Sequence, residues 1–128
     1  MTEPRRLCRK RTRGWRSPPG AVSVTRPGRF SNKYRLEFDL AQRHWLVWHG
    51  RRAVVGIFIS EADARKTCVE MFWRTLPPAE LEAARNMLVG CDLMCWCSEP
   101  PSGIPDREWC HAGWLIEAVN APLKCEAA

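Results

Sequence analysis

Three cysteines and a histidine that could do chemistry lie close together near the C-terminal end of this 128-residue sequence. Cys95 and Cys97 follow a short apolar stretch, and Cys110 and His111 come after a proline-rich loop. Zinc prefers sulfur and imidazole ligands, so one prediction is a zinc site formed by Cys95, Cys97, Cys110 and His111. The C-x-C spacing and the adjacent Cys-His pair are unusual for zinc, so two other interpretations stay open.

The second interpretation is a catalytic site with a reactive thiol. A cysteine at a helix N-terminus lies at the positive end of the helix dipole, which favours the thiolate. Cys110 fits this position, and His111 beside it could donate or accept a proton. The third interpretation is structural, because free cysteine is among the most buried residue types and Cys95 lies in an apolar stretch.

The first 35 residues are strongly basic, since they contain eleven of the 20 Lys and Arg residues and one of the 14 acidic residues. Guanidinium groups pair with phosphate oxygens, so this region predicts a partner that carries phosphate, either a nucleotide or nucleic acid. A solubilising charged surface is the alternative. The residues predicted to contact phosphate are Arg13, Arg16, Arg26, Arg29 and Asn32.

Seven tryptophans are many for this length, and most of them are expected in the core. Trp96 and Trp109 flank the Cys and His residues, where an indole could stack on a nucleobase. The sequence has no P-loop and no G-x-G-x-x-G, G-x-S-x-G or H-E-x-x-H motif, which excludes several large enzyme classes. Apart from zinc, the sequence predicts no cofactor.

The elements that must position these residues belong to a single α/β domain with a mixed sheet and three helices. A basic, flexible arm is predicted at residues 1–14, and the domain at residues 15–128. The strands of the sheet are expected at residues 21–25, 44–48, 53–59 and 92–97, and the helices at residues 61–75, 79–89 and 111–120. Residues 34–38 could join the next two strands in an antiparallel meander.

The expected topology brings the candidate residues together at one edge of the sheet. In α/β folds, ligands bind beyond the carboxyl ends of the strands. The end of the 92–97 strand and the start of the 111–120 helix should meet at this edge. The loop after the first strand, which carries Arg26 and Asn32, can reach it too. Residues 98–109 between them are rich in proline and are predicted to be irregular.

The cysteines and the hydropathy pattern also bear on the location of the protein. Seven cysteines are an odd number, and no apolar N-terminal segment with a cleavage site comes before them. A secreted disulfide scaffold is therefore not expected. The sequence has no run of about 18 apolar residues. We expect a cytoplasmic protein with reduced thiols and no membrane partner.

Motifs at both ends of the chain resemble a family of small phage and bacterial proteins that is classed as a domain of unknown function. They are R-G-W-x-x-P-P, V-x-R-P followed by an Asn, and C-W-C followed by C-H-A. The chain departs from the family pattern at residues 31–34, where Ser-Asn-Lys-Tyr replaces G-N-P-F, and at Gly113, where the family has Asp. The resemblance implies a compact α/β domain in a phage or mobile-element setting and brings no established activity.

The leading hypothesis is a phage-type protein of the host cytoplasm that binds or acts on a nucleotide, or on a base in nucleic acid, as a hydrolase or transferase. In this hypothesis arginines and the N-terminus of the last helix hold phosphate, a tryptophan stacks on the base, and Cys110 or His111 handles protons. The alternative is a non-catalytic module that binds nucleic acid or a host protein. Its Cys and His residues would stabilise the fold, with or without zinc.

Overall fold

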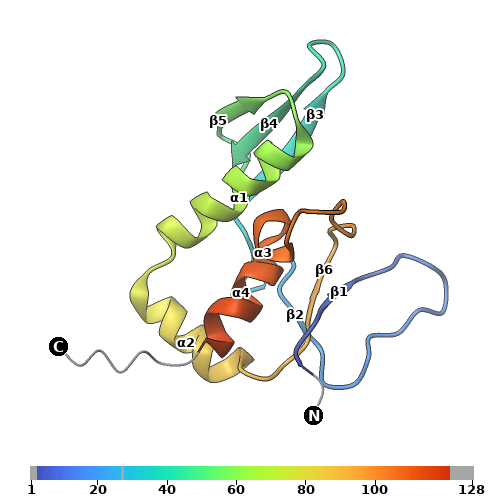
Figure 1. Cartoon of the computed structure of the whole chain (residues 1–128), viewed down its shortest axis with the longest axis vertical. Coiled ribbons are helices and arrows are strands. Elements are labelled where there is room, and N and C mark those ends of the chain that lie inside the picture. Colours follow the sequence, from blue (N-terminus) through green and yellow to red (C-terminus); the bar gives the residue numbers. More distant parts are fainter. Residues whose placement is uncertain (1–2, 27, 122–128) are drawn as a thin grey trace.

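The computed structural model of the chain describes residues 3–26 and 28–121 (Figure 1). Its strands and helices are, in chain order, β1 (Arg6–Cys8), β2 (Val22–Ser23), β3 (Tyr34–Asp39), β4 (His44–His49), β5 (Ala53–Phe58), α1 (Glu61–Thr75), α2 (Pro78–Leu88), β6 (Leu93–Cys95), α3 (Asp106–Trp109) and α4 (His111–Asn120). The predicted α/β class is confirmed. The strands, however, divide between two three-stranded sheets instead of forming one mixed sheet.

The first sheet is parallel, and its central strand comes from late in the chain. β1 and β2 both pair with β6, so that Arg6 and Val22 lie on opposite sides of Leu93. All three residues of β6 are buried, as expected for an apolar strand in the middle of a parallel sheet. β1 lies within residues 1–14, which the sequence predicted to be a flexible arm. The structure instead orders Arg6–Cys8, because these residues pair with β6.

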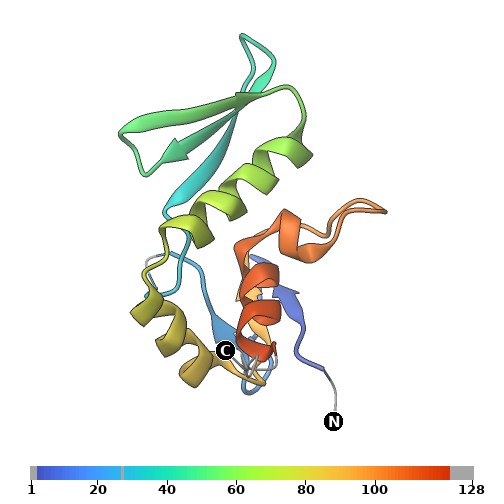
Figure 2. The same cartoon turned by 60° about the vertical axis from the view of Figure 1, so that its left-hand side comes forward.

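The second sheet is the antiparallel meander that the sequence predicted. β3 pairs with β4 along its whole length, from Tyr34 opposite His49 to Asp39 opposite His44, and β4 pairs with β5. Because short turns connect these strands, each finds its partner locally and none joins β6. Helix α1 packs against all three strands of the meander (Figure 2).

The three helices predicted from the sequence are confirmed. α1 and α4 begin and end at the predicted residues, and α2 begins and ends one residue earlier. Ser60 caps α1, because its side-chain oxygen accepts a hydrogen bond of 3.1 Å from the backbone N–H of Asp63. The segment predicted to be irregular contains one additional helical turn, α3.

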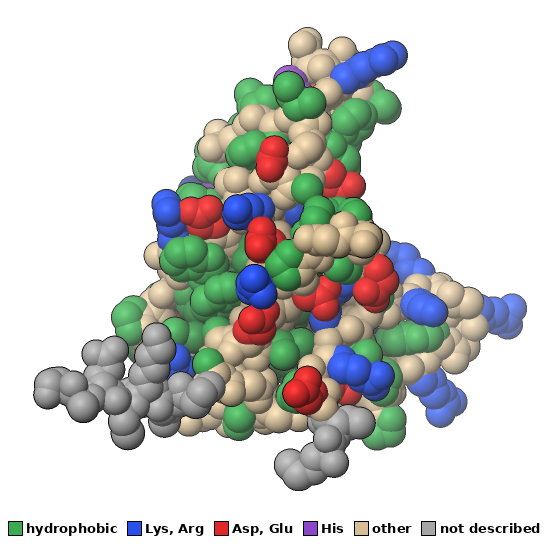
Figure 3. Space-filling view, viewed as in Figure 1, with side chains coloured by type: hydrophobic (Ala, Val, Ile, Leu, Met, Phe, Trp, Pro, Cys, Tyr) green, Lys and Arg blue, Asp and Glu red, His purple; other side chains and the backbone are tan. Residues whose placement is uncertain are grey.

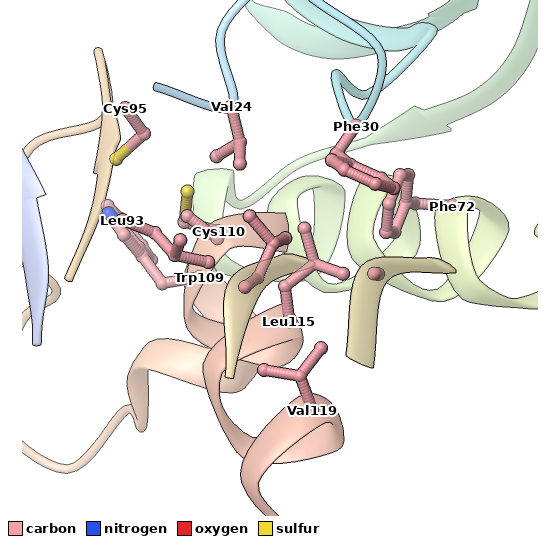
Figure 4. Packing of buried hydrophobic residues seen from close by; sticks show 12 residues of the cluster. Val24, Phe30, Phe72, Leu93, Cys95, Trp109, Cys110, Leu115 and Val119 are labelled. Atoms are coloured by element: carbon pink, nitrogen blue, oxygen red, sulfur yellow. The ribbon is translucent and has the colours of Figure 1, made fainter. Parts of the chain in front are cut away.

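Two clusters of buried side chains form the core, and helix α1 contributes to both. The larger cluster packs β6 and α4 together, with Leu93 and Leu115 fully buried, and it extends to Phe72 of α1 (Figure 4). The smaller cluster lies between the meander and α1 and contains Val47 and Cys68. Because α1 has side chains in both clusters, it fixes the positions of the two sheets relative to each other.

Gly113 in α4 is required by the close approach of α3. A Cβ atom at this position would lie 2.5 Å from the carbonyl oxygen of Asp106. In an exposed helix, replacement of glycine by alanine stabilises by about 1 kcal/mol. Here we expect Gly113→Ala to lower the free energy of unfolding by roughly 1–3 kcal/mol, because α3 must move to make room.

Urea unfolding followed by circular dichroism measures this change. Glu82→Ala, at an exposed position of α2, is the control and should change the free energy of unfolding by less than about 0.5 kcal/mol. A Gly113→Ala variant as stable as the parent protein would contradict the packing of α3 on α4 described above.

Candidate functional site

A cavity of about 380 Å³ lies between the parallel sheet and the meander. Its wall comes from the end of β2, from β3, from α1, from the end of β6 and from the start of α4. Of the residues predicted to form a site, Arg26, Asn32, Cys95, Trp96, Cys97, Trp109, Cys110 and His111 line this cavity. The parallel β2 and β6 direct their carboxyl ends to it, the usual place for a ligand in an α/β fold.

The sulfur atoms of three predicted ligands converge in the cavity. The Sγ atoms of Cys95, Cys97 and Cys110 all lie within 4.8 Å of one another. Cys95 ends β6, a bend at Trp96 follows, and Cys110 precedes α4. Figure 4 shows Cys95 and Cys110 facing each other between β6 and the start of α4. We call these three residues the sulfur cluster, and its donor atoms could hold a metal ion.

Hydrogen bonds within the sulfur cluster favour negative charge on Cys97. The thiols of Cys110 and Cys95 donate to its sulfur, which lowers the pKa of Cys97, and the guanidinium of Arg65 acts in the same direction. The hydrogen bonds of Cys110 with Cys95 and Cys97, together with burial, raise the pKa of Cys110. The arrangement thus favours the thiolate form of Cys97 over that of Cys110, whereas the sequence had singled out Cys110 for its position at a helix N-terminus.

A buried positive charge lies against the sulfur cluster. The side chain of Arg6 is only 1% exposed, and its guanidinium donates to the Sγ of Cys95 at 3.1 Å. It also donates to the carbonyl oxygens of Cys97 and Ser98, both at 3.0 Å, and to the carboxylate of Asp106 at 3.2 Å. Burial opposes the charge, but the contacts with Cys95, Cys110 and Asp106 together outweigh it and raise the pKa of Arg6. The guanidinium therefore stays protonated.

His111 lies beside the sulfur cluster but makes structural contacts. Its Nε2 is 3.1 Å from the carbonyl oxygen of Val24, which can only accept, so Nε2 is the donor. The ring packs edge-on against Phe72, with 5.0 Å between the centroids. Burial lowers the pKa of His111 to about 4, so the imidazole is neutral at pH 7. His111 thereby ties the start of α4 to the chain just before Arg26.

Three arginines, Arg26, Arg35 and Arg65, bring positive charge to the cavity wall. Arg65 pairs with Glu61 at 2.8 Å, and Arg35 donates to the carbonyl oxygen of Gly50 at 2.9 Å. Arg26 is exposed, and within the described part of the chain no ion pair engages it. Arg35 makes no ion pair with a described residue either, but its side chain is partly buried, so Arg26 is the most exposed of the three charges for an anionic ligand. The sequence did not predict Arg35 and Arg65, which come from β3 and α1.

Two of the predicted phosphate ligands are already engaged in other contacts. Asn32 lines the cavity, but its side-chain amide donates to the carbonyl oxygen of Cys68 at 3.2 Å. Its side-chain oxygen accepts from the backbone N–H of Tyr34 at 2.9 Å. Arg29 lies outside this cavity and pairs with Glu80 at 3.0 Å. Asn32 thus shapes the loop before β3.

The other two predicted phosphate ligands lie in a basic loop between β1 and β2. Arg13 and Arg16 are exposed there and do not line the cavity. Arg9 and Arg11, which belong to the same basic stretch of the sequence, lie over the ring of Trp96, with guanidinium-to-centroid distances of 4.5 and 4.3 Å. Figure 3 shows Lys and Arg side chains gathered on this side of the molecule, where Figure 1 shows the loop projecting.

The two tryptophans predicted to stack on a base differ in exposure. Trp109 is only 4% exposed, and its Nε1 donates to the carbonyl oxygen of Ser98 at 2.9 Å, so it belongs to the core. Trp96 is 43% exposed and lines the cavity. Both indoles line the cavity, and Trp96 is the more exposed of the two.

A family model for a domain of unknown function, DUF4326, matches residues 7–121 of the chain. This span includes every residue that lines the cavity, and it confirms the expectation of an uncharacterised domain. No curated protein and no solved structure matches the chain significantly. Among the described residues, no helix has the length and apolar content that a membrane span requires.

Arg6 should be among the most sensitive positions for stability. Lysine keeps the positive charge at this position, but its single ammonium group cannot donate to the four acceptors that the planar guanidinium of Arg6 reaches. We expect Arg6→Lys to lower the free energy of unfolding by roughly 2–4 kcal/mol, because buried acceptors then lose their donor. Chemical unfolding under reducing conditions measures the change.

The neighbouring Arg5 offers a matched control, since its side chain is exposed. Arg5→Lys should leave the free energy of unfolding within about 0.5 kcal/mol of the parent value. If both lysine variants were equally stable, the buried hydrogen bonds of Arg6 would not contribute as described.

Proposed function

The chain belongs to the DUF4326 family, a domain of unknown function, and we propose from the geometry of its cavity that it binds a nucleotide, either free or within a nucleic acid. The observation that carries this proposal is the meeting of an uncommitted arginine, an exposed indole and the sulfur cluster in one cavity of about 380 Å³. Pockets for small ligands have volumes from about 300 Å³ upward.

Each part of a nucleotide finds a suitable group in the cavity. Arg26 pairs with a phosphate oxygen, and Arg35, whose charge no ion pair neutralises in the described part of the chain, adds positive charge from β3. The N-terminus of α4 contributes partial positive charge. Trp96 is exposed, and a base stacks on its ring in place of a guanidinium group of Arg9 or Arg11, which lie over the ring in this structure.

The sulfur cluster is the most reactive group that lines the cavity, so we place any chemistry on the bound nucleotide there. Hydrolysis or group transfer fits a site that combines sulfur donors with a phosphate-binding arginine. The resemblance to phage proteins adds a setting to the proposal, the cytoplasm of a bacterial host.

The stack of Arg9 and Arg11 on Trp96 supports a second candidate function, a non-catalytic module that binds nucleic acid. Basic side chains interleaved with an aromatic ring are typical of surfaces that bind single strands. The exposed Arg13 and Arg16 extend this surface along the loop. In this function the sulfur cluster would only stabilise the fold, with a structural zinc ion, and the same basic loop could hold an acidic host protein.

Replacement of Arg26 tests the first function. We expect Arg26→Ala to weaken the binding of nucleoside monophosphates about 10- to 100-fold, because one charged hydrogen bond contributes roughly 1.5–3 kcal/mol. Isothermal titration with a panel of nucleoside monophosphates measures the affinities, and thermal unfolding should be unchanged because Arg26 is exposed.

Arg29→Ala is the matched control, since Arg29 is exposed on the same loop and pairs with Glu80 outside the cavity. It should leave nucleotide affinity unchanged. Equal affinities for the parent protein and Arg26→Ala would refute the proposed phosphate site.

Salt dependence tests the second function. If the basic loop makes about six phosphate contacts, the affinity for a single-stranded oligonucleotide should fall roughly 1000-fold between 50 and 200 mM salt. Arg11→Ala should reduce both the affinity and the steepness of this fall, whereas Arg51→Ala, in the turn between β4 and β5, should change neither. A flat salt profile would rule out the basic loop as a nucleic-acid surface.

A further inference from the structure

We propose that Cys95, Cys97 and Cys110 bind one zinc ion, and that the fourth coordination position of this ion opens into the cavity. This goes beyond nucleotide binding, because the ion would then be part of the ligand site in addition to stabilising the fold. The inference rests on the positions of the sulfur atoms, on the contacts of their neighbours and on the surface that they line.

The three sulfur atoms are already close to the positions that a zinc ion requires. Tetrahedral zinc with bonds of about 2.3 Å to sulfur has sulfur atoms about 3.8 Å apart. The Sγ atoms of the cluster lie within 4.8 Å of one another, so small side-chain rotations bring them to that spacing. Three sulfur donors select a soft ion such as zinc over magnesium or calcium, which prefer oxygen.

The surroundings suit sulfur that carries negative charge. Three thiolates on Zn²⁺ give a net charge of −1, and the buried guanidinium of Arg6 donates to the Sγ of Cys95 at 3.1 Å. Such outer hydrogen bonds orient the ligands of a metal site and offset their charge. Two backbone carbonyls and Asp106 fix the same guanidinium, so this donor is in place whether or not an ion is bound.

The described residues provide no fourth ligand. Among them, no imidazole, carboxylate or further thiol joins the three sulfur atoms. The imidazole of His111 is bonded to Val24, and the thiol of Cys8 donates to the carbonyl oxygen of Cys97 at 2.7 Å. All three ligands line the cavity. Zinc held by three protein ligands with one exchangeable position is typical of catalytic sites, where the ion polarises an oxygen of the substrate or of water.

X-ray absorption of the reduced, full-length protein, reconstituted with zinc after treatment with a chelator, tests the coordination. We expect one zinc per chain, with three sulfur neighbours at about 2.3 Å and one nitrogen or oxygen neighbour at about 2.0 Å. Four sulfur neighbours, or protein that takes up no zinc, would overturn the proposal. Cys125 lies outside the described residues, so Cys125→Ser is included, and a loss of zinc from this variant would also overturn it.

Cobalt in place of zinc tests where the fourth position points. Sodium azide is a small anion that binds an exchangeable position directly, and it should change the visible absorption of the cobalt protein. An unchanged spectrum would overturn the open position. Because neither experiment contains a nucleotide, their outcomes are independent of the nucleotide-binding proposal.

Variants identify the ligands. Cys97→Ser should weaken zinc binding by more than about 100-fold, and circular dichroism checks that the variant folds. Cys97 is partly exposed, so its replacement disturbs packing less than replacement of its buried partners. Cys91→Ser, a partly exposed cysteine outside the cluster, should bind zinc like the parent protein. Equal affinity in both variants would refute the assignment of Cys97.

Discussion

The buried guanidinium of Arg6 joins three parts of the structure that are far apart in the chain. It extends from β1, it donates to the two carbonyl oxygens that follow β6, and it pairs with Asp106 at the start of α3. A buried carbonyl without a donor is costly, so these contacts hold the bend that places Cys97 next to Cys95. The geometry of the sulfur cluster thus depends on one charge from the N-terminal strand.

The cavity lies between two sheets of different kinds, and α1 connects them because it packs on the meander and on α3 and α4. The parallel sheet directs the ends of β2 and β6 toward one place, which brings Arg26 near the sulfur cluster. The meander and α1 close the opposite wall and add Arg35 and Arg65. α1 holds both walls in position because its side chains belong to both buried clusters.

The sequence predicted well the features that depend on neighbouring residues, and poorly those that depend on residues far apart in the chain. Helix ends and the meander depend on caps, periodicity and short turns, all of which lie within a few neighbouring residues. β1 could not be foreseen, because a three-residue strand has no readable period and its partner lies 87 positions further along the chain. Arg65 was missed for a similar reason, since its approach to the cavity depends on how the sheets pack. Trp109 and Trp96 both flank the cysteines, and proximity in sequence did not reveal that only Trp96 is exposed.

The order of the strands in the parallel sheet also affects how the chain folds during synthesis. β1 and β2 are made first, but their common partner β6 is not made until residues 93–95. The meander and α1 need only near neighbours, so they can form while the basic N-terminal segment is still unpaired. Until residues 97 and 98 are made, Arg6 lacks the two carbonyl oxygens to which it donates in the folded chain. The thiol of Cys8 then also lacks its acceptor, the carbonyl oxygen of Cys97. The first strand of the chain is therefore among the last to reach its place.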